Sequence, residues 1–234
     1  SVVSSLNHHG DLSLGNIFGS NIANIGLVLG IGTLICKLPV TGQIVSTEFP
    51  LLVLTTLIVG VVCIFLGLTI FWACVLLLGF CVLMWKWFTL GKNQSVVGTE
   101  AEELITGVQY SYKSWIMVSC GLLMLVVGGK ATEIGAVAAA TSFGMSKILI
   151  GGTVVAIATS LPEVVTTVVA ARKGHPDLAV GNVVGSNIFN ILFVLPITVL
   201  VAPDMTIAVP SSAVVYIAVM LFMTILAWAL TTSG

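Results

Sequence analysis

Long apolar stretches limit the structures that this chain can form. A helix needs about 20 mostly apolar residues to cross about 30 Å of hydrocarbon. Seven stretches meet this requirement: 12–36, 48–66, 69–90, 115–140, 148–171, 178–201 and 209–231. The second and third are divided only by the segment LGLT around Gly67. Because helices satisfy their own backbone hydrogen bonds in lipid, the sequence predicts an all-α polytopic membrane protein.

Composition supports this class and excludes others. Hydrophobic residues make up 58% of the 234 residues and charged residues only 7%, whereas soluble domains carry about 25% charged residues. The net charge of −1 and the scattered Lys and Arg argue against a nucleic-acid partner. The five cysteines lie in apolar runs without metal-site spacing, so we expect no disulfide or zinc-type site. We also expect no enzymatic activity and no bound cofactor.

Basic residues are divided unequally between the two sides of the membrane. If the chain crosses once per stretch, one side carries six of them: Lys37, Lys86, Lys92, Lys113, Arg172 and Lys173. The other side carries Lys130 and Lys147. The positive-inside rule makes the first side cytoplasmic. The polar segment 91–114 is then a cytoplasmic loop.

One segment of the sequence occurs twice. Residues 11–34 match residues 177–200 at 14 of 24 positions, at an offset of 166. Five crossings separate the first span from the sixth, so the two copies run through the membrane in opposite directions. Inverted repeats of this kind are typical of secondary transporters, whose binding site lies near the bilayer midplane between the copies.

Each copy carries polar side chains on one face of an otherwise apolar helix. They are Asn16, Ser20 and Asn24 in the first copy, and Asn182, Ser186 and Asn190 in the second. Residues four apart share a helix face, so each copy presents a row of neutral oxygens. The alternative is interhelical hydrogen bonding beside a packing seam, because Gly15/Gly19 and Gly181/Gly185 have GxxxG spacing. Duplication in inverted orientation favours a transport face.

A carboxylate stands just before the second copy. Glu163 lies about fifteen residues into an apolar stretch, where a charge costs about 2.5–3.5 kcal/mol and is by default functional. Pro162 breaks the helix and frees carbonyl oxygens near Thr159, while Thr159 and Ser160 add hydroxyl groups. Such a set of oxygens suits Na⁺ or Ca²⁺. The alternative is a proline kink whose glutamate faces a water-filled crevice.

These motifs carry a resemblance. ATSLPE at 158–163 with GNVVGSNIFN at 181–190, together with the inverted GNIFGSNIAN at 15–24, resembles the alpha-repeats of the sodium/calcium exchanger family, in its prokaryotic form. This family belongs to the cation/calcium exchanger superfamily. The resemblance implies ten spans in two five-span halves, of which about seven complete spans are present here. It also implies four repeat helices around one Ca²⁺ site and several Na⁺ sites.

The resemblance implies a role for individual residues. Glu163 would be the carboxylate shared by Ca²⁺ and Na⁺, and Thr159 and Ala156 would offer backbone carbonyls. Five further side chains would complete the ion site: Ser160, Ser20, Asn24, Ser186 and Asn190. Ala158 stands where the family usually has glycine, and Asn190 stands where many members have aspartate, which puts potassium dependence in doubt.

The resemblance also implies how the chain is organised. The first half would be 1–90, with an alpha-1 repeat at 1–41, and the second 115–234, with an alpha-2 repeat at 148–207. The glutamate of the first copy would fall ahead of residue 1, so we expect a chain truncated at both ends and lacking the last span. We expect an integral protein of the prokaryotic inner membrane, surrounded by lipid, and leave its oligomeric state open.

The implied function is secondary active antiport of Ca²⁺ against Na⁺ by alternating access. Two alternatives remain open from the sequence. In one, H⁺ replaces Na⁺ and Glu163 releases protons. In the other, the protein is a passive cation channel, although the inverted repeat argues against it.

Overall fold

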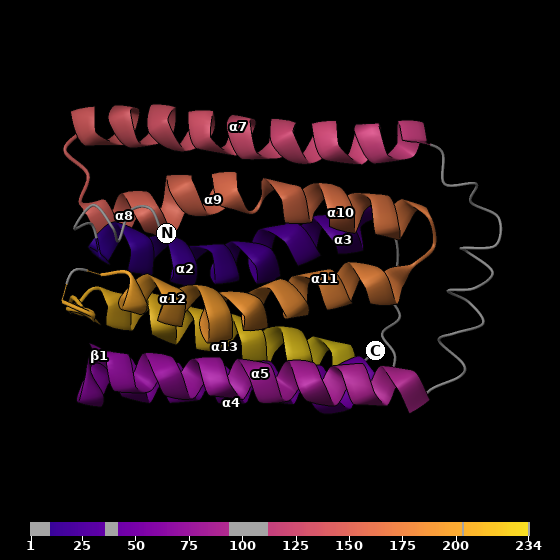
Figure 1. The fold of residues 1–234 in the computed structure, drawn as a ribbon, viewed down its shortest axis with the longest axis horizontal. Coiled ribbons are helices and arrows are strands. Elements are labelled where there is room, and N and C mark those ends of the chain that lie inside the picture. The colour runs from indigo at the N-terminus through magenta and orange to yellow at the C-terminus, as the bar shows by residue number, and fades with distance from the viewer. Residues whose placement is uncertain (1–9, 36–41, 94–111, 203, 234) are drawn as a thin grey trace.

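The chain forms a bundle of helices whose axes lie nearly parallel (Figure 1). The computed structural model describes residues 10–35, 42–93, 112–202 and 204–233. The first span runs through α2 (Gly10–Ala23), η1 (Asn24–Leu29) and α3 (Gly30–Ile35), where η denotes a π-helical turn. The second runs through η2 (Ile44–Glu48), α4 (Phe49–Val61) and η3 (Val62–Leu66), and α5 (Ile70–Asn93) follows.

The later helices begin with α7 (Tyr112–Ser142). The next span consists of α8 (Lys147–Ile150), η4 (Gly151–Val155), α9 (Ala156–Thr159) and α10 (Leu161–Arg172). It is followed by α11 (Pro176–Phe189), η5 (Asn190–Val194) and α12 (Leu195–Leu200), and then by α13 (Ala213–Ser233). Two short strands, β1 (Leu68–Thr69) and β2 (Thr206–Ile207), pair antiparallel at one end of the bundle.

The predicted all-α membrane fold is confirmed. Among the described residues, six helical segments are long and apolar enough to cross a membrane, and they correspond to six of the seven predicted stretches. The seventh, 115–140, lies within the 31-residue helix α7. Gly67, with a φ of 79°, ends η3, because glycine adopts this backbone conformation without steric cost. The division between the second and third stretches is therefore confirmed.

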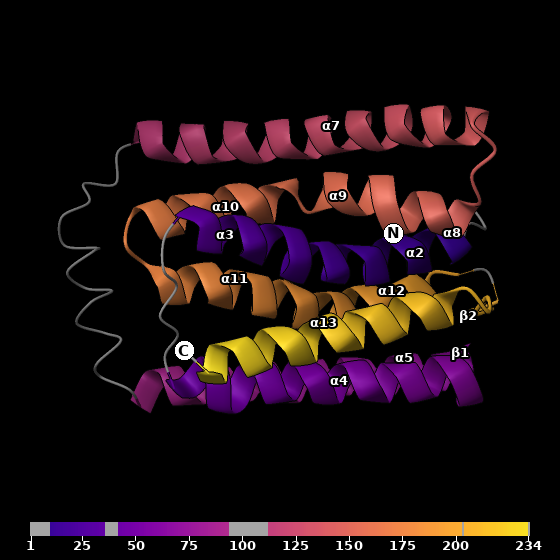
Figure 2. The ribbon, with the colours of Figure 1, turned by 180° about the vertical axis from the view of Figure 1, so that it is seen from behind.

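The two copies of the repeat lie at the centre of the bundle and run in opposite directions. From α2 to α3 the chain runs one way, and from α11 to α12 it runs back (Figure 1). Of the most apolar window of each repeat span, 56% is buried, against 11% for Ile70–Thr89. Helix α13 packs against α2 and α4 (Figure 2). The repeat copies thus form the inner layer.

Glycines let α2 approach the span that follows α7. A Cβ atom on Gly15 would overlap the backbone of Ile148, and one on Gly19 would overlap the backbone of Gly152. At the equivalent positions of the second copy, Gly181 and Gly185, a Cβ would meet nothing within 4 Å among the described residues. The GxxxG seam is therefore used by the first copy, and the two copies differ in what they pack against.

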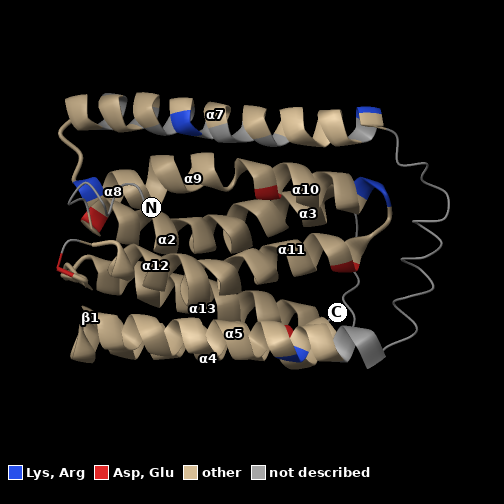
Figure 3. Ribbon diagram, in the orientation of Figure 1, with Lys and Arg blue, Asp and Glu red and all other residues tan. Residues whose placement is uncertain are grey.

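Charged residues lie mainly near the ends of the helices (Figure 3). Arg172 ends α10 and Lys113 lies in the first turn of α7, and these helix ends share one end of the bundle (Figure 1). Lys147 begins α8 at the opposite end. This arrangement agrees with the predicted sides for these three residues. Lys37, the side chain of Lys92 and most of the predicted 91–114 loop lie outside the described residues.

Candidate ion-binding site

Glu163 lies where a helix is broken inside the bundle. The span Lys147–Arg172 is interrupted at Ser160 (φ −90°, ψ −2°), and Pro162 lies in the first turn of α10. Proline has no N–H to continue the preceding hydrogen-bond ladder. The break therefore places Glu163 in the first turn of a new helix, where the backbone dipoles favour a negative charge.

The second repeat span holds Glu163 from one side. Ser186 Oγ donates to Glu163 Oε1 at 2.9 Å. Asn182 Nδ2 donates to the Glu163 carbonyl at 3.4 Å and to Thr167 Oγ1 at 3.2 Å. Glu163 Oε2 is buried and has no hydrogen-bond partner among the described residues. One carboxylate oxygen is thus oriented by α11 and the other is available to a ligand.

Three other buried side-chain oxygens share this property. One of them, Thr56 Oγ1, lies on α4, and the other two lie at or beside α10. Asn24 Oδ1, on the first residue of η1, and Ser160 Oγ, at the break, have no hydrogen-bond partner among the described residues. Each unpaired buried oxygen costs about 1–3 kcal/mol, and η1 packs against α10. Carboxylate, amide and hydroxyl oxygens are the ligands that hard cations prefer. Glu163 Oε2, Asn24 Oδ1 and Ser160 Oγ are therefore candidate ligands for a hard cation.

The other predicted ligands are engaged in different ways. Thr159 Oγ1 donates to Asn16 Oδ1 (3.0 Å) and to the Ala156 carbonyl (3.1 Å). The Ala156 carbonyl also accepts from the Ser160 N–H at 3.1 Å, so both of its lone pairs are used. Ser20 Oγ donates to the Asn16 and Ile17 carbonyls of its own helix and keeps its accepting capacity. Ion binding by these residues stays a prediction.

Four asparagines join the two repeat spans. We call this set, which consists of Asn21, Asn24, Asn187 and Asn190, the asparagine ring. Asn21 Nδ2 donates to the Asn187 carbonyl (3.4 Å), and Asn187 Nδ2 donates to the Asn21 carbonyl (3.2 Å). Asn24 Nδ2 donates to Asn187 Oδ1, and Asn190 Nδ2 donates to Asn21 Oδ1, both at 2.9 Å. Asn24 and Asn190 are the first residues of η1 and η5, and π turns recur at functional sites.

The predicted site residues do not include Asn21 and Asn187, although both are buried at the centre of this ring. Both belong to the repeated GSN triplet at the offset of 166. The inverted repeat was the signal that could have found them. Identical residues at equivalent positions of inverted copies can meet at the axis that relates the copies.

Glu163 is the acidic residue of this cluster, and the remaining oxygens are neutral. Asp11 and Asp177 lie in the first turns of α2 and α11, where the helix dipole favours a negative charge. Within the described part of the chain, no three His, Cys, Asp or Glu side chains gather as a metal site. The cluster therefore combines one negative charge with amide and hydroxyl oxygens.

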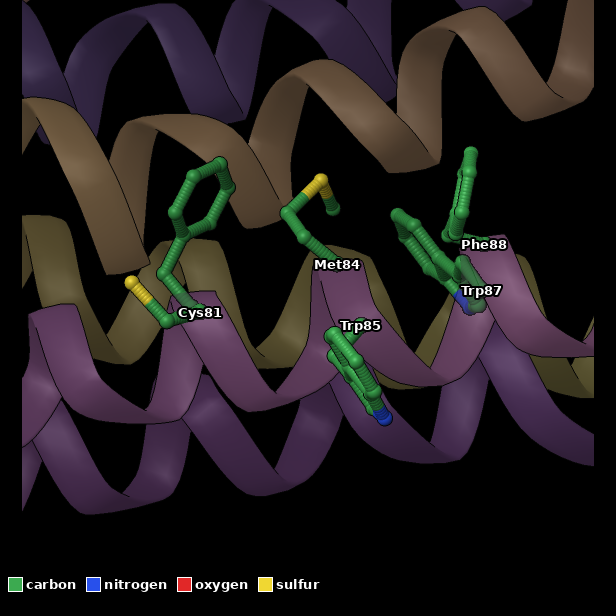
Figure 4. A pocket seen from close by; sticks show the side chains of 6 residues that line it. Cys81, Met84, Trp85, Trp87 and Phe88 are labelled. Atoms are coloured by element: carbon green, nitrogen blue, oxygen red, sulfur yellow. The ribbon is translucent and has the colours of Figure 1, made fainter.

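A separate hollow of about 630 Å³ lies along α5. It is lined by Phe80, Cys81, Met84, Trp85, Trp87 and Phe88 (Figure 4). Phe80 also packs against two rings of the second repeat span, with centroid distances of 5.8 Å to Phe189 and 5.1 Å to Phe193. Because the lining offers no oxygen ligand, this hollow does not belong to the ion-binding cluster.

Comparison with protein families gives a match over most of the chain. A family described as sodium/calcium exchanger protein matches residues 1–88 and 113–234. The relative named "Putative antiporter CaxA", from Alkalimonas amylolytica, is 38% identical over 196 residues, which cover 82% of this chain and 61% of the relative. Inner membrane protein YrbG of Escherichia coli is 32% identical over 211 residues, which cover 87% and 64%.

Comparison with solved structures gives a similar result. The sodium-calcium exchanger NCX_Mj, soaked with zero Na⁺ and Ca²⁺, matches with a TM-score of 0.72 and 28% sequence identity. The match covers 100% of this chain and 72% of the NCX_Mj chain. This chain thus spans 61% and 64% of the length of the two sequence relatives.

Proposed function

Because this chain belongs to the sodium/calcium exchanger protein family, we propose that the protein exchanges Ca²⁺ for Na⁺ across the membrane. Glu163 would be the shared carboxylate. Ser160, Asn24, Asn190, Ser186 and Ser20 would contribute side-chain oxygens, and Thr159 its backbone carbonyl. The Ala156 carbonyl would join them only by exchanging one of its two local hydrogen bonds for the ion. Ca²⁺ and Na⁺ are the transported substrates in this proposal.

One observation carries the proposal. Glu163 Oε2, Ser160 Oγ and Asn24 Oδ1 are buried oxygens without hydrogen-bond partners among the described residues, and they come from both predicted alpha-repeats, 1–41 and 148–207. A cation coordinated by all three would recover the hydration that these atoms lose on burial. Because the copies run in opposite directions, this set of ligands can be approached from either side of the membrane.

Charge explains why the two ions would compete. Glu163 supplies one negative charge, which suffices for one Na⁺, whereas Ca²⁺ needs a second negative charge to be held at low cost. A second carboxylate at the site would supply it. With two carboxylates, the same oxygens can hold either Ca²⁺ or Na⁺ ions, but hardly both at once. Mutually exclusive binding is the requirement for exchange.

Alternating access would need local changes in the helices around the ions. Two irregular features of the helices near the cluster could accommodate such changes. One is the break at Ser160, and the other is the pair of π turns, η1 and η5. Helix α7 packs mainly against α8, η4 and α9. In the proposed cycle, α7 would slide as its neighbours rearrange.

The test is ⁴⁵Ca²⁺ uptake into Na⁺-loaded proteoliposomes, with Glu163→Gln compared with the unchanged protein. We expect uptake to fall by at least about a hundredfold, since removing one member of a buried charge pair costs about 3–5 kcal/mol. Asp204→Asn is the matched control, because Asp204 is exposed near β2 and its substitution removes a carboxylate far from the cluster. Unchanged uptake in Glu163→Gln would contradict the site.

The same vesicles separate the other possibilities. Uptake driven by a pH gradient without Na⁺ would indicate H⁺ coupling. Uptake in the absence of either counter-ion gradient would indicate a passive channel. The proposal predicts uptake only when Na⁺ is present inside.

A further inference from the structure

The hydrogen bonds of the asparagine ring come in two equivalent pairs. If 166 is added to the residue of the first copy and subtracted from the residue of the second, the bond from Asn24 to Asn187 becomes the bond from Asn190 to Asn21. The two side-chain-to-carbonyl bonds exchange in the same way. The ring therefore follows the symmetry of the inverted repeat, and its two halves make equivalent hydrogen bonds.

The ring determines which atom of Asn24 and Asn190 remains free. In both residues Nδ2 is committed to the ring, at 2.9 Å from an amide oxygen. Asn24 Oδ1 therefore points away from that bond, and it has no hydrogen-bond partner among the described residues. If the Asn24 amide were reversed, its oxygen would face Asn187 Oδ1, and its N–H groups would take the place of the free oxygen. An amide N–H group repels a cation, whereas an amide oxygen binds it.

The central pair is fixed more firmly than the outer pair. Asn21 and Asn187 are 0% exposed, and each uses its side-chain oxygen and nitrogen together. Asn21 Nδ2 also donates to Met220 Sδ of α13, at 3.4 Å. A flip of Asn21 would break these bonds along with the one from Asn190. The central asparagines thus hold one orientation and impose it on their neighbours.

We infer that Asn21 and Asn187 are positioning residues for the transported cation. Each one acts on the ligand of the opposite copy: Asn21 orients Asn190, and Asn187 orients Asn24. The inference rests on the proposed function, since it concerns the affinity of the same ion site. It adds two residues that never touch the ion and assigns each a specific partner.

The first test replaces Asn21 or Asn187 by Leu, which has a similar shape but no hydrogen-bonding group. Loss of groups that orient metal ligands typically lowers metal affinity by about 10- to 100-fold. We therefore expect the KM for Ca²⁺ in ⁴⁵Ca²⁺ uptake to rise by about tenfold or more, with a smaller change in maximal rate. A purely structural role would instead lower the maximal rate through loss of folded protein and leave KM unchanged.

The second test is a set of double mutants that uses the crossed pairing. Asn21→Leu combined with Asn190→Ala should raise KM no more than Asn190→Ala alone, since Asn21 acts through Asn190. Asn21→Leu combined with Asn24→Ala should give the product of the two single effects, as independent sites do. Asn187→Leu should show the reverse pattern. Coupling of Asn21 to Asn24, its neighbour on the same helix, would overturn the inference.

A conservative variant distinguishes loss of positioning from misfolding. Asn21→Asp keeps an acceptor for Asn190 Nδ2, so its KM should lie closer to that of the unchanged protein than the KM of Asn21→Leu. An Asn21→Asp KM as high as that of Asn21→Leu would contradict the positioning role. All variants are compared as protein that elutes as a single peak in size-exclusion chromatography.

The outcomes separate the two proposals. If the unchanged protein shows no Na⁺-dependent uptake, the proposed function fails. If uptake is normal and Glu163→Gln abolishes it, but Asn21→Leu and Asn187→Leu leave KM unchanged, the positioning role alone fails.

Discussion

Ser186 holds the Glu163 carboxylate in one orientation. Its hydroxyl donates to Glu163 Oε1 at 2.9 Å, which leaves Oε2 as the oxygen without a described hydrogen-bond partner. A hydrogen bond to a charged group contributes about 1.5–3 kcal/mol. In Ser186→Ala the carboxylate can rotate, so its oxygens are no longer presented to the ion in a fixed direction.

We expect Ser186→Ala to raise the KM for Ca²⁺ by about ten- to a hundredfold, measured by ⁴⁵Ca²⁺ uptake at several Ca²⁺ concentrations. The matched control is Thr55→Val, which also removes a buried hydroxyl. Thr55 Oγ1 bonds only to the Leu52 carbonyl of its own helix, α4, among the described residues, so it makes no described hydrogen bond to the cluster. An equal effect of both substitutions would point to general destabilisation.

At the scale of elements, contacts between glycine backbones bring α2 and η4 together. An added Cβ on Gly19 would overlap the Gly152 backbone, which cannot move aside as a flexible side chain can. Overpacking of this kind typically costs about 1–3 kcal/mol. The contact also sets the distance between Asn16 and Thr159, which hydrogen-bond across the same pair of spans.

We expect Gly19→Ala to lower the apparent unfolding temperature of the detergent-purified protein. Gly79→Ala in α5 is the control, because a Cβ at Gly79 would meet nothing within 4 Å among the described residues. It should leave the unfolding temperature unchanged or raise it slightly, since Ala favours a helix over Gly by up to about 1 kcal/mol. Equal behaviour of the two variants would argue against the close contact.

The break at Ser160 gives a second prediction for an element. In Pro162→Ala the missing N–H is restored, so α9 and α10 can join and Glu163 can rotate with the repaired helix. We expect unchanged or higher thermal stability together with a higher KM for Ca²⁺. Thermal unfolding and ⁴⁵Ca²⁺ uptake of the same preparation would separate the two effects. A normal KM would show that the break does not position Glu163.

The sequence is sufficient to predict the helices but not the way they cross. The length of the apolar stretches predicts the spans, and Pro162 predicts the break, because both depend on local chemistry. The π turns at Asn24 and Asn190 have no signature in the apolar pattern. The contact between Ser186 and Glu163 and the ring around Asn21 depend on how separate helices pack. Likewise, both lone pairs of the Ala156 carbonyl are used locally, which spacing alone does not reveal.

At the scale of the whole molecule, the orientation in the membrane can be tested directly. The turn between α10 and α11 and the turn before α8 lie at opposite ends of the bundle (Figure 1). The first begins with Lys173, directly after Arg172 at the end of α10. In a background without native cysteines, we expect His175→Cys to react with a membrane-impermeant maleimide only from the cytoplasmic side. Ser146→Cys should react only from the opposite side. The reverse pattern would contradict the orientation predicted from the basic residues.

The asparagine ring also bears on how such a molecule could arise. Each copy contributes the same short pattern, an asparagine followed three residues later by another, and each pattern satisfies the hydrogen bonds of the other. Two identical chains inserted in opposite orientations could therefore have formed the same contact as a self-complementary dimer. Fusion into one chain would then free each copy to diverge. In related sequences we expect substitutions to occur together at the two hydrogen-bonded pairs, 21 with 190 and 187 with 24. The surrounding residues are expected to change independently of one another.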